Sequence, residues 1–126
     1  MQSIVLRALV ACGFVFAASA ASADSYREVW ICKVKDGKEI EEVQATNSKW
    51  LAFVRENVDK GIKSGVSTAV VGGLEGLLFV DTYPSLEVWA AAKKALDTEE
   101  GNALDEVFEG LFDCDQNRLW KYESTK

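Results

Sequence analysis

The chain has 126 residues, of which 48% are hydrophobic and 27% are charged, and its formal net charge is −6. This length predicts one domain, and the acidic balance excludes nucleic acids and anionic lipid surfaces as partners, because both repel a negative domain. The chain has no histidine, which excludes a histidine-ligated haem or zinc ion and a catalytic base of the Ser/His or Cys/His type.

Residues 1–23 have the three-part layout of a secretory signal. Arg7 supplies a positive charge, residues 8–20 form an uncharged apolar run, and Ala21-Ser22-Ala23 is a small-residue cleavage site. The apolar run is shorter than the about 20 residues that span a bilayer. We therefore expect cleavage after Ala23, a single periplasmic or secreted domain at residues 24–126, and no membrane span in it.

A lipoprotein signal is the competing interpretation of this segment. Cys12 follows Leu9-Val10-Ala11, which resembles a lipid-attachment motif. The apolar run continues past Cys12 to a good cleavage site, and this favours the secretory signal.

The first half of the predicted domain contains a strand, a helix and a second strand. Residues 27–34 are rich in β-branched and aromatic side chains and end at a Lys35-Asp36-Gly37 turn. Residues 39–58 repeat apolar side chains at helical spacing, with acidic residues in the first turn. Residues 66–71 (VSTAVV) predict the second strand.

The second half begins with a strand at residues 77–83, joined to the previous one by a glycine-rich link that predicts a hairpin. After Pro84, Ser85 can cap a helix over residues 86–96. A polar interruption at 97–102 separates it from a second helical segment at 103–112, and residues 114–122 predict the last strand.

The predicted order is β-α-β-β-α-β, the ferredoxin-like arrangement of the α+β class. It gives a four-stranded antiparallel sheet with its helices on one face. The first and last strands are neighbours in this topology, which brings Cys32 close to Cys114. Loss of Cys12 with the signal leaves these two cysteines alone, and an even count in an oxidising compartment predicts that they form a disulfide.

The first three strands are apolar in both alternating phases. In the first strand, Val29 and Ile31 alternate with Trp30, Cys32 and Val34. Such a strand needs cover on both faces. We expect a homodimer that packs sheet against sheet, and cover by the long second helical region is the alternative.

The segments GLLFVDTYPS, LEVWAAAKKAL and CDQNRLWKYE, in this element order, resemble the dimeric α+β barrel superfamily. That superfamily includes small monooxygenases of the antibiotic-biosynthesis type, haem-degrading relatives, stress-responsive barrel proteins and uncharacterised secreted domains. The resemblance covers the whole predicted domain and implies a ligand cavity beside the sheet. The cofactor-free monooxygenases among these proteins use an asparagine, a tryptophan and an arginine to bind and polarise a phenolic substrate.

Four tryptophans lie on predicted helices and strands, where they either fill the core or line an apolar pocket. Asn47 and Trp50 are one helical turn apart, so both can face inward, and the resemblance suggests Arg118 as the third polarising residue. We expect a ligand pocket formed by Trp30, Asn47, Trp50, Tyr83, Arg118 and Trp120. No catalytic residue is assigned.

Other polar clusters predict no metal or cofactor site. Asp113–Asn117 begins like a calcium loop, but Arg118 stands where glycine is needed and Ser124 where a glutamate is needed. Gly72, Gly73 and Gly76 precede a strand rather than the helix that a phosphate loop requires. The acidic residues of 97–109 fit a solvated helix face.

The sequence is compatible with three functions. The domain binds a small apolar or aromatic ligand, or it is a cofactor-independent monooxygenase acting on a quinol or phenolic substrate, or it is an interaction module whose dimer surface is its function. A cavity with Asn47 or Arg118 pointing into it would favour the first two over the third.

Overall fold

The computed structural model describes residues 24–72 and 76–125. The export signal predicted for residues 1–23 lies outside the described residues. The elements are β1 (Ser25–Val34), α1 (Ile40–Asn57), β2 (Lys63–Thr68), β3 (Leu77–Tyr83), α2 (Leu86–Ala95), α3 (Glu99–Leu111) and β4 (Phe112–Tyr122). The predicted β-α-β-β-α-β order is confirmed, with its second helical region divided into α2 and α3.

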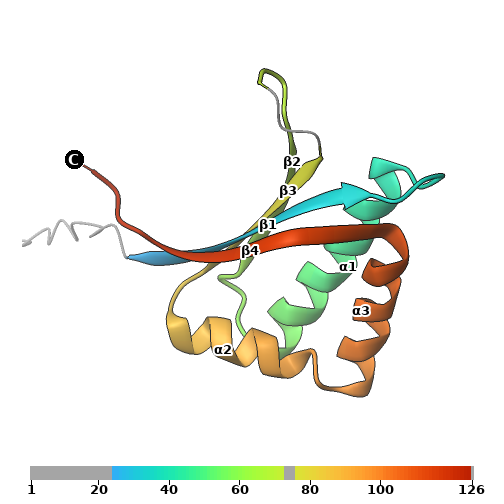
Figure 1. Ribbon diagram of the computed structural model, residues 1–126. Coiled ribbons are helices and arrows are strands. Elements are labelled where there is room, and N and C mark those ends of the chain that lie inside the picture. The colour runs from blue at the N-terminus through green and yellow to red at the C-terminus, as the bar shows by residue number, and fades with distance from the viewer. Residues whose placement is uncertain (1–23, 73–75, 126) are drawn as a thin grey trace, which may run out of the picture.

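The four strands form one antiparallel sheet in the order β2-β3-β1-β4. The helices α1, α2 and α3 lie against one face of this sheet, and no helix of the described residues lies on the opposite face (Figure 1). This is the ferredoxin-like α+β architecture predicted from the sequence. β1 is central and contacts β4 along ten residue pairs, so Ser25 at the start of β1 lies opposite Tyr122 at the end of β4.

The position of β2 differs from the prediction, which placed this strand at residues 66–71. The strand runs from Lys63 to Thr68, and Thr68 pairs with Leu77, the first residue of β3. Residues 69–72 therefore lie beyond the end of the ladder between β2 and β3. Val70 and Val71, which suggested a strand by their β-branched side chains, are 94% and 92% exposed beyond the end of the sheet.

Side-chain caps fix the start of two helices. The hydroxyl oxygen of Ser85 accepts a hydrogen bond from the Val88 N–H at 3.2 Å, as its place before α2 predicts. The hydroxyl oxygen of Thr98 accepts one from the Gly101 N–H at 3.2 Å. The cap at Thr98 starts α3 at Glu99, four residues before the predicted segment, and the exposed polar residues Glu99, Glu100 and Asn102 belong to its first turn.

The core lies between the sheet and the helices in two clusters of buried side chains. One contains Trp50, Phe53, Val54, Ile62, Tyr83 and Ala92, and the other contains Cys32, Val43, Leu77, Phe79 and Leu111. None of the helices in the part of the chain that the structure describes is long and apolar enough to cross a bilayer.

The face of the sheet without helices is also apolar at its centre. Side chains alternate between faces along a strand, so the buried Phe79 and the partly buried Trp30 face the helices, while Val80 and its partner Val29 lie on the bare face. Ile31 and Leu78, paired with each other, are the next residues on that face. This patch of four side chains, Val29, Ile31, Leu78 and Val80, is called the outer patch below.

Candidate functional site

A cavity of about 530 Å³ lies between the helix-covered face of the sheet and helices α1 and α3. This volume is within the range of small-molecule sites. The sheet contributes Trp30, Phe79, Asp81, Phe112, Asp113 and Cys114, and the helices and connections contribute Lys35, Asn47, Trp50, Leu96, Asp105, Phe108 and Glu109.

Five aromatic rings form most of the apolar wall. The rings of Phe79, Phe108 and Phe112 contact one another, with centroid distances of 4.7 Å between Phe79 and Phe112, 5.4 Å between Phe108 and Phe112, and 6.2 Å between Phe79 and Phe108. Trp30 from β1 and Trp50 from α1 are the other two. These distances are those of mutually packed rings, so the wall is set by contacts between its own members.

Two polar side chains of the wall are buried, Asp81 and Asn47. Asp81 is 6% exposed, and its Oδ1 accepts a hydrogen bond from the Ser64 hydroxyl at 2.5 Å. Asn47 extends this chain, because its Nδ2 donates to the Ser64 Oγ at 2.9 Å. Burial raises the pKa of Asp81 to about 6, with a smaller raising effect from Glu28, against lowering effects from the Ser64 hydrogen bond and from Lys93.

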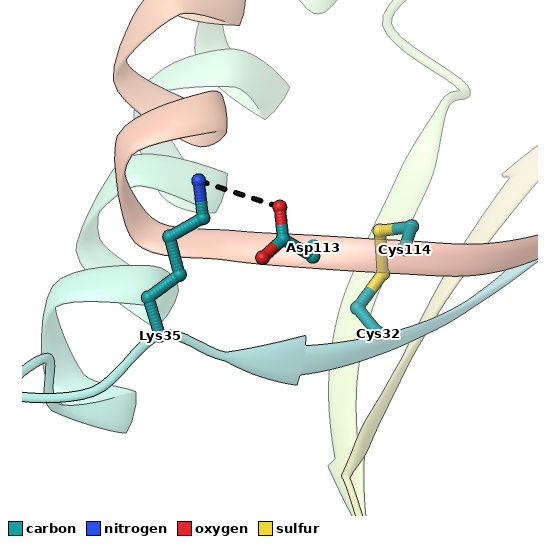
Figure 2. Close-up of a disulfide and its surroundings, with 4 residues drawn as sticks. All are labelled: Cys32, Lys35, Asp113 and Cys114. Atoms are coloured by element: carbon teal, nitrogen blue, oxygen red, sulfur yellow. Dashed lines mark ion pairs between the residues drawn. A yellow bond between two sulfur atoms is a disulfide. The ribbon is translucent and has the colours of Figure 1, made fainter.

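The mouth of the cavity is acidic. Asp105, Glu109 and Asp113 are exposed there, and Lys35 is the one basic residue among the lining side chains. The Lys35 Nζ lies 3.3 Å from Asp113 Oδ1 and donates to the backbone oxygen of Glu109 at 2.5 Å. The Lys35 side chain reaches from the turn after β1 toward β4, where Asp113 neutralises its charge (Figure 2).

A second buried carboxylate, Glu28, lies next to Asp81 in the sheet but does not line the cavity. Its Oε2 is 2.5 Å from the Lys93 Nζ and accepts hydrogen bonds from the Trp89 Nε1 and the Tyr83 hydroxyl, both at 3.3 Å. Its Oε1 accepts a hydrogen bond from Asn117 Nδ2 at 2.8 Å. These contacts tie β1 to β3, β4 and α2.

Cys32 and Cys114 form a disulfide between β1 and β4, as their places on neighbouring strands predict (Figure 2). Cys114 is also part of the cavity wall. The bridge therefore fixes β4 to β1 beside the cavity mouth.

The structure brings three of the six predicted pocket residues together at the cavity, namely Trp30, Asn47 and Trp50. Tyr83 is fully buried in the adjacent core and donates to Glu28.

Arg118 and Trp120 are not brought to the cavity. They pair with Val29 and Arg27, whose side chains lie on the bare face of the sheet. The cause is a bulge in β4. Ile31 pairs with Gln116 and Cys32 with Cys114, so the ladder skips one residue and the alternation after it is reversed.

Asp81 and the phenylalanines of the wall were missed as candidate residues. The signal for Asp81 is its phase in the strand LLFVDTY, where it alternates with Phe79 and Tyr83 on one face. An acidic residue in the apolar phase of a strand predicts a buried carboxylate, and buried carboxylates are frequent at functional sites. The phenylalanines carry no such signal, since core packing uses the same residues.

The sequence matches no protein-family model and no curated protein. Solved structures do match the fold. SnoaB, a cofactor-independent oxygenase from Streptomyces nogalater, is similar with a TM-score of 0.61 and 12% identity, over 82% of this chain and 97% of SnoaB. A NIPSNAP-like domain protein from Burkholderia xenovorans has a TM-score of 0.59 and 16% identity, over 82% of this chain and 89% of its own.

A dimeric ferredoxin-like protein of unknown function from Thermobifida fusca has a TM-score of 0.50 and 10% identity, over 80% of this chain and 92% of its own. The chain has the dimeric α+β barrel fold. At these identities the likeness establishes the fold alone. In this α+β barrel domain, the cavity between sheet and helices is the feature from which a function can be argued.

No group of three or more Cys, Asp or Glu side chains within residues 24–72 and 76–125 is placed to hold a metal ion.

Proposed function

We propose that the cavity binds a small apolar or aromatic ligand. The observation that carries this proposal is a space of about 530 Å³ whose wall combines five aromatic rings with two buried polar groups, Asp81 and Asn47. Ligand sites have this composition, because the apolar wall supplies most of the binding free energy and a few polar groups fix the orientation of the ligand. A cavity of this kind favours ligand binding over a pure interaction module.

Calorimetric titration with 1-naphthol, a neutral aromatic probe, tests this proposal. We expect saturable binding that weakens at least tenfold in Phe108→Ala, because this variant removes a ring from the wall. Trp120→Ala is the matched control, since it removes an aromatic side chain that is 53% exposed on the bare face. Equal affinities in wild type and Phe108→Ala would contradict the proposal.

A cofactor-independent oxygenase is the second candidate, and the placement of Asp81 favours it. Its carboxylate and the Asn47 amide both line the cavity and are linked through Ser64. A carboxylate whose pKa is raised to about 6 is a suitable base for a substrate proton at neutral pH. The likeness to SnoaB supports the same candidate.

The reaction can be written for an anthrone or a related quinol-type substrate. Asp81 takes one proton, Asn47 donates a hydrogen bond to the substrate oxygen, and the resulting carbanion reduces O₂. The ring CH₂ becomes C=O with one oxygen atom, and the second oxygen atom leaves as H₂O with the two hydrogens. Four electrons leave the carbon and four reduce O₂, so no other reductant is needed.

Oxygen consumption with anthrone tests the second candidate. We expect one O₂ per anthrone consumed, and rates lowered at least 100-fold in Asp81→Asn and Asn47→Ala, as for the loss of a proton-transfer group. Trp50→Phe tests the contribution of the indole to substrate binding. If no oxygen is consumed although 1-naphthol binds, the oxygenase is excluded and ligand binding stands.

We also propose that the domain at residues 24–126 is exported after cleavage at Ala23 and assembles as a homodimer through its outer patch. A stable disulfide is typical of oxidising compartments, and the matched Thermobifida fusca protein is dimeric. Terminal sequencing of the protein recovered outside the cytoplasm should begin at Asp24. A retained Met1, or a chain lipidated at Cys12, would contradict this cleavage.

A further inference from the structure

The charges around the cavity are unbalanced. Four carboxyl groups line it, those of Asp81, Asp105, Glu109 and Asp113, and they face one ammonium group. That ammonium, on Lys35, is already held by Asp113 and by a backbone oxygen. A cavity with low-dielectric walls and charges of one sign concentrates its potential at the opening, so the potential here is negative.

The aromatic wall adds to this preference. The face of an aromatic ring is electron-rich and attracts cations, most strongly in tryptophan. Trp30 shows this behaviour in the structure, because the Lys93 Nζ lies 5.1 Å from the centroid of its ring. Trp50, Phe79, Phe108 and Phe112 offer further rings to a cationic ligand in the cavity.

Asp81 is placed to bind the charge directly. Its Oδ1 accepts from Ser64, whereas its Oδ2 accepts no hydrogen bond from any residue in the described ranges, and the carboxyl group lines the cavity. The charged groups that face it are Glu28 from β1 and Lys93 from α2, and these two pair with each other at 2.5 Å. Asp81 is therefore hydrogen-bonded to Ser64, which in turn bonds Asn47, but it has no ion-pair partner among the described residues. A buried carboxylate without a cation is costly.

We propose that the cavity selects a cationic aromatic ligand, an arylalkyl amine whose ammonium group binds Asp81 while its ring packs between the aromatic walls. This inference rests on the proposed function, since it names the class of ligand for the same cavity. It separates the site from one that binds acids or phosphorylated molecules, which the four carboxyl groups repel.

An isosteric series tests the inference. Tryptamine, tryptophol and indole-3-acetate share an indole ring and differ in a side chain of charge +1, 0 or −1. Calorimetry at pH 7.5 compares their affinities. We expect tryptamine to bind at least tenfold more tightly than tryptophol, and indole-3-acetate to bind most weakly. Because the pKa of Asp81 is raised to about 6, the advantage of tryptamine should decrease at pH 5, where tryptamine remains charged and Asp81 is largely protonated.

Asp81→Asn keeps the size of the side chain and removes the charge. In this variant we expect the ratio of the tryptamine affinity to the tryptophol affinity to fall to one or below. Asp115→Asn is the matched control, because Asp115 is an exposed acid of β4 that does not line the cavity. If Asp81→Asn does not fold, the salt dependence decides: raising NaCl from 0.05 to 0.5 M should weaken tryptamine and leave tryptophol unchanged.

The failures of this inference and of the proposed function are distinguishable. If 1-naphthol or tryptophol binds and tryptamine binds no more tightly than tryptophol, the cationic preference is wrong and ligand binding stands. If neither neutral probe nor tryptamine binds, the proposed function is wrong and the inference falls with it. Tighter binding of tryptamine that is retained in a folded Asp81→Asn would also overturn the assignment of Asp81.

Discussion

Removal of the negative charge of Glu28 should destabilise the fold more than any other conservative change of an acidic residue. The side chain is 1% exposed and accepts from Lys93, Trp89, Tyr83 and Asn117. Glu28→Gln keeps the shape, but its NH₂ group must face a donor on one side or the other. A buried donor left without an acceptor costs about 1–3 kcal/mol, and loss of the pair with Lys93 adds to this.

The total expected for Glu28→Gln is about 2–4 kcal/mol, because Lys93 is 32% exposed and can turn partly to water. Urea unfolding followed by circular dichroism, at one fixed protein concentration, measures this loss as a lower midpoint. Glu123→Gln, which removes an exposed carboxylate paired with Lys121, is the control and should unfold at the wild-type midpoint. If Glu28→Gln lies within about 0.5 kcal/mol of wild type, our account of this cluster is refuted.

Three further predictions concern Asp81, the outer patch and the disulfide. The pKa of Asp81 is raised from 3.8 to about 6 in the folded state, so between these pH values the folded chain binds more protons than the unfolded chain. This group therefore adds stability as the pH falls from 7 to 4. Asp81→Asn should be more stable than wild type in urea at pH 7.5 and should lose that advantage by pH 4. Val80→Glu should convert a dimer to a monomer in sedimentation, whereas Val107→Glu, at a half-exposed position of α3, should not; a wild-type monomer would contradict the assembly. Cys32→Ser/Cys114→Ser, which opens a bridge over 82 residues, should lower the unfolding free energy by about 4 kcal/mol in the chain-entropy account, and a loss below about 1 kcal/mol would show that the reduced chain is already restrained.

The sequence was sufficient for the fold because each strand and helix has a clear period and a clear boundary. Ser85 and Pro84 mark the start of α2, and β3 was predicted with the bounds that the structure has. β2 was misplaced, because Val70 and Val71 favour a strand locally and only the pairing with β3 decides where the ladder ends.

The site was predictable only in part, for a reason of register. Asn47 and Trp50 belong to one helix, where spacing alone places them on one face. Arg118 and Trp120 belong to a strand whose phase is set by a bulge, and a single skipped residue exchanges the two faces. No local pattern in the strand marks that bulge, so the sequence could not show that Asn117, rather than Arg118, points toward the helices.

The same bulge has a consequence for solubility. β4 is an edge strand of eleven residues. The outward backbone N–H and C=O groups of an edge strand of this length can pair with strands of other chains. The irregularity beside Cys114 interrupts the straight run of donors and acceptors, and the charged side chains of Asp113, Asp115, Arg118 and Lys121 follow along the strand. These features discourage strand addition along this border, and the proposed homodimer would instead use the apolar bare face of the sheet, where one partner covers the outer patch.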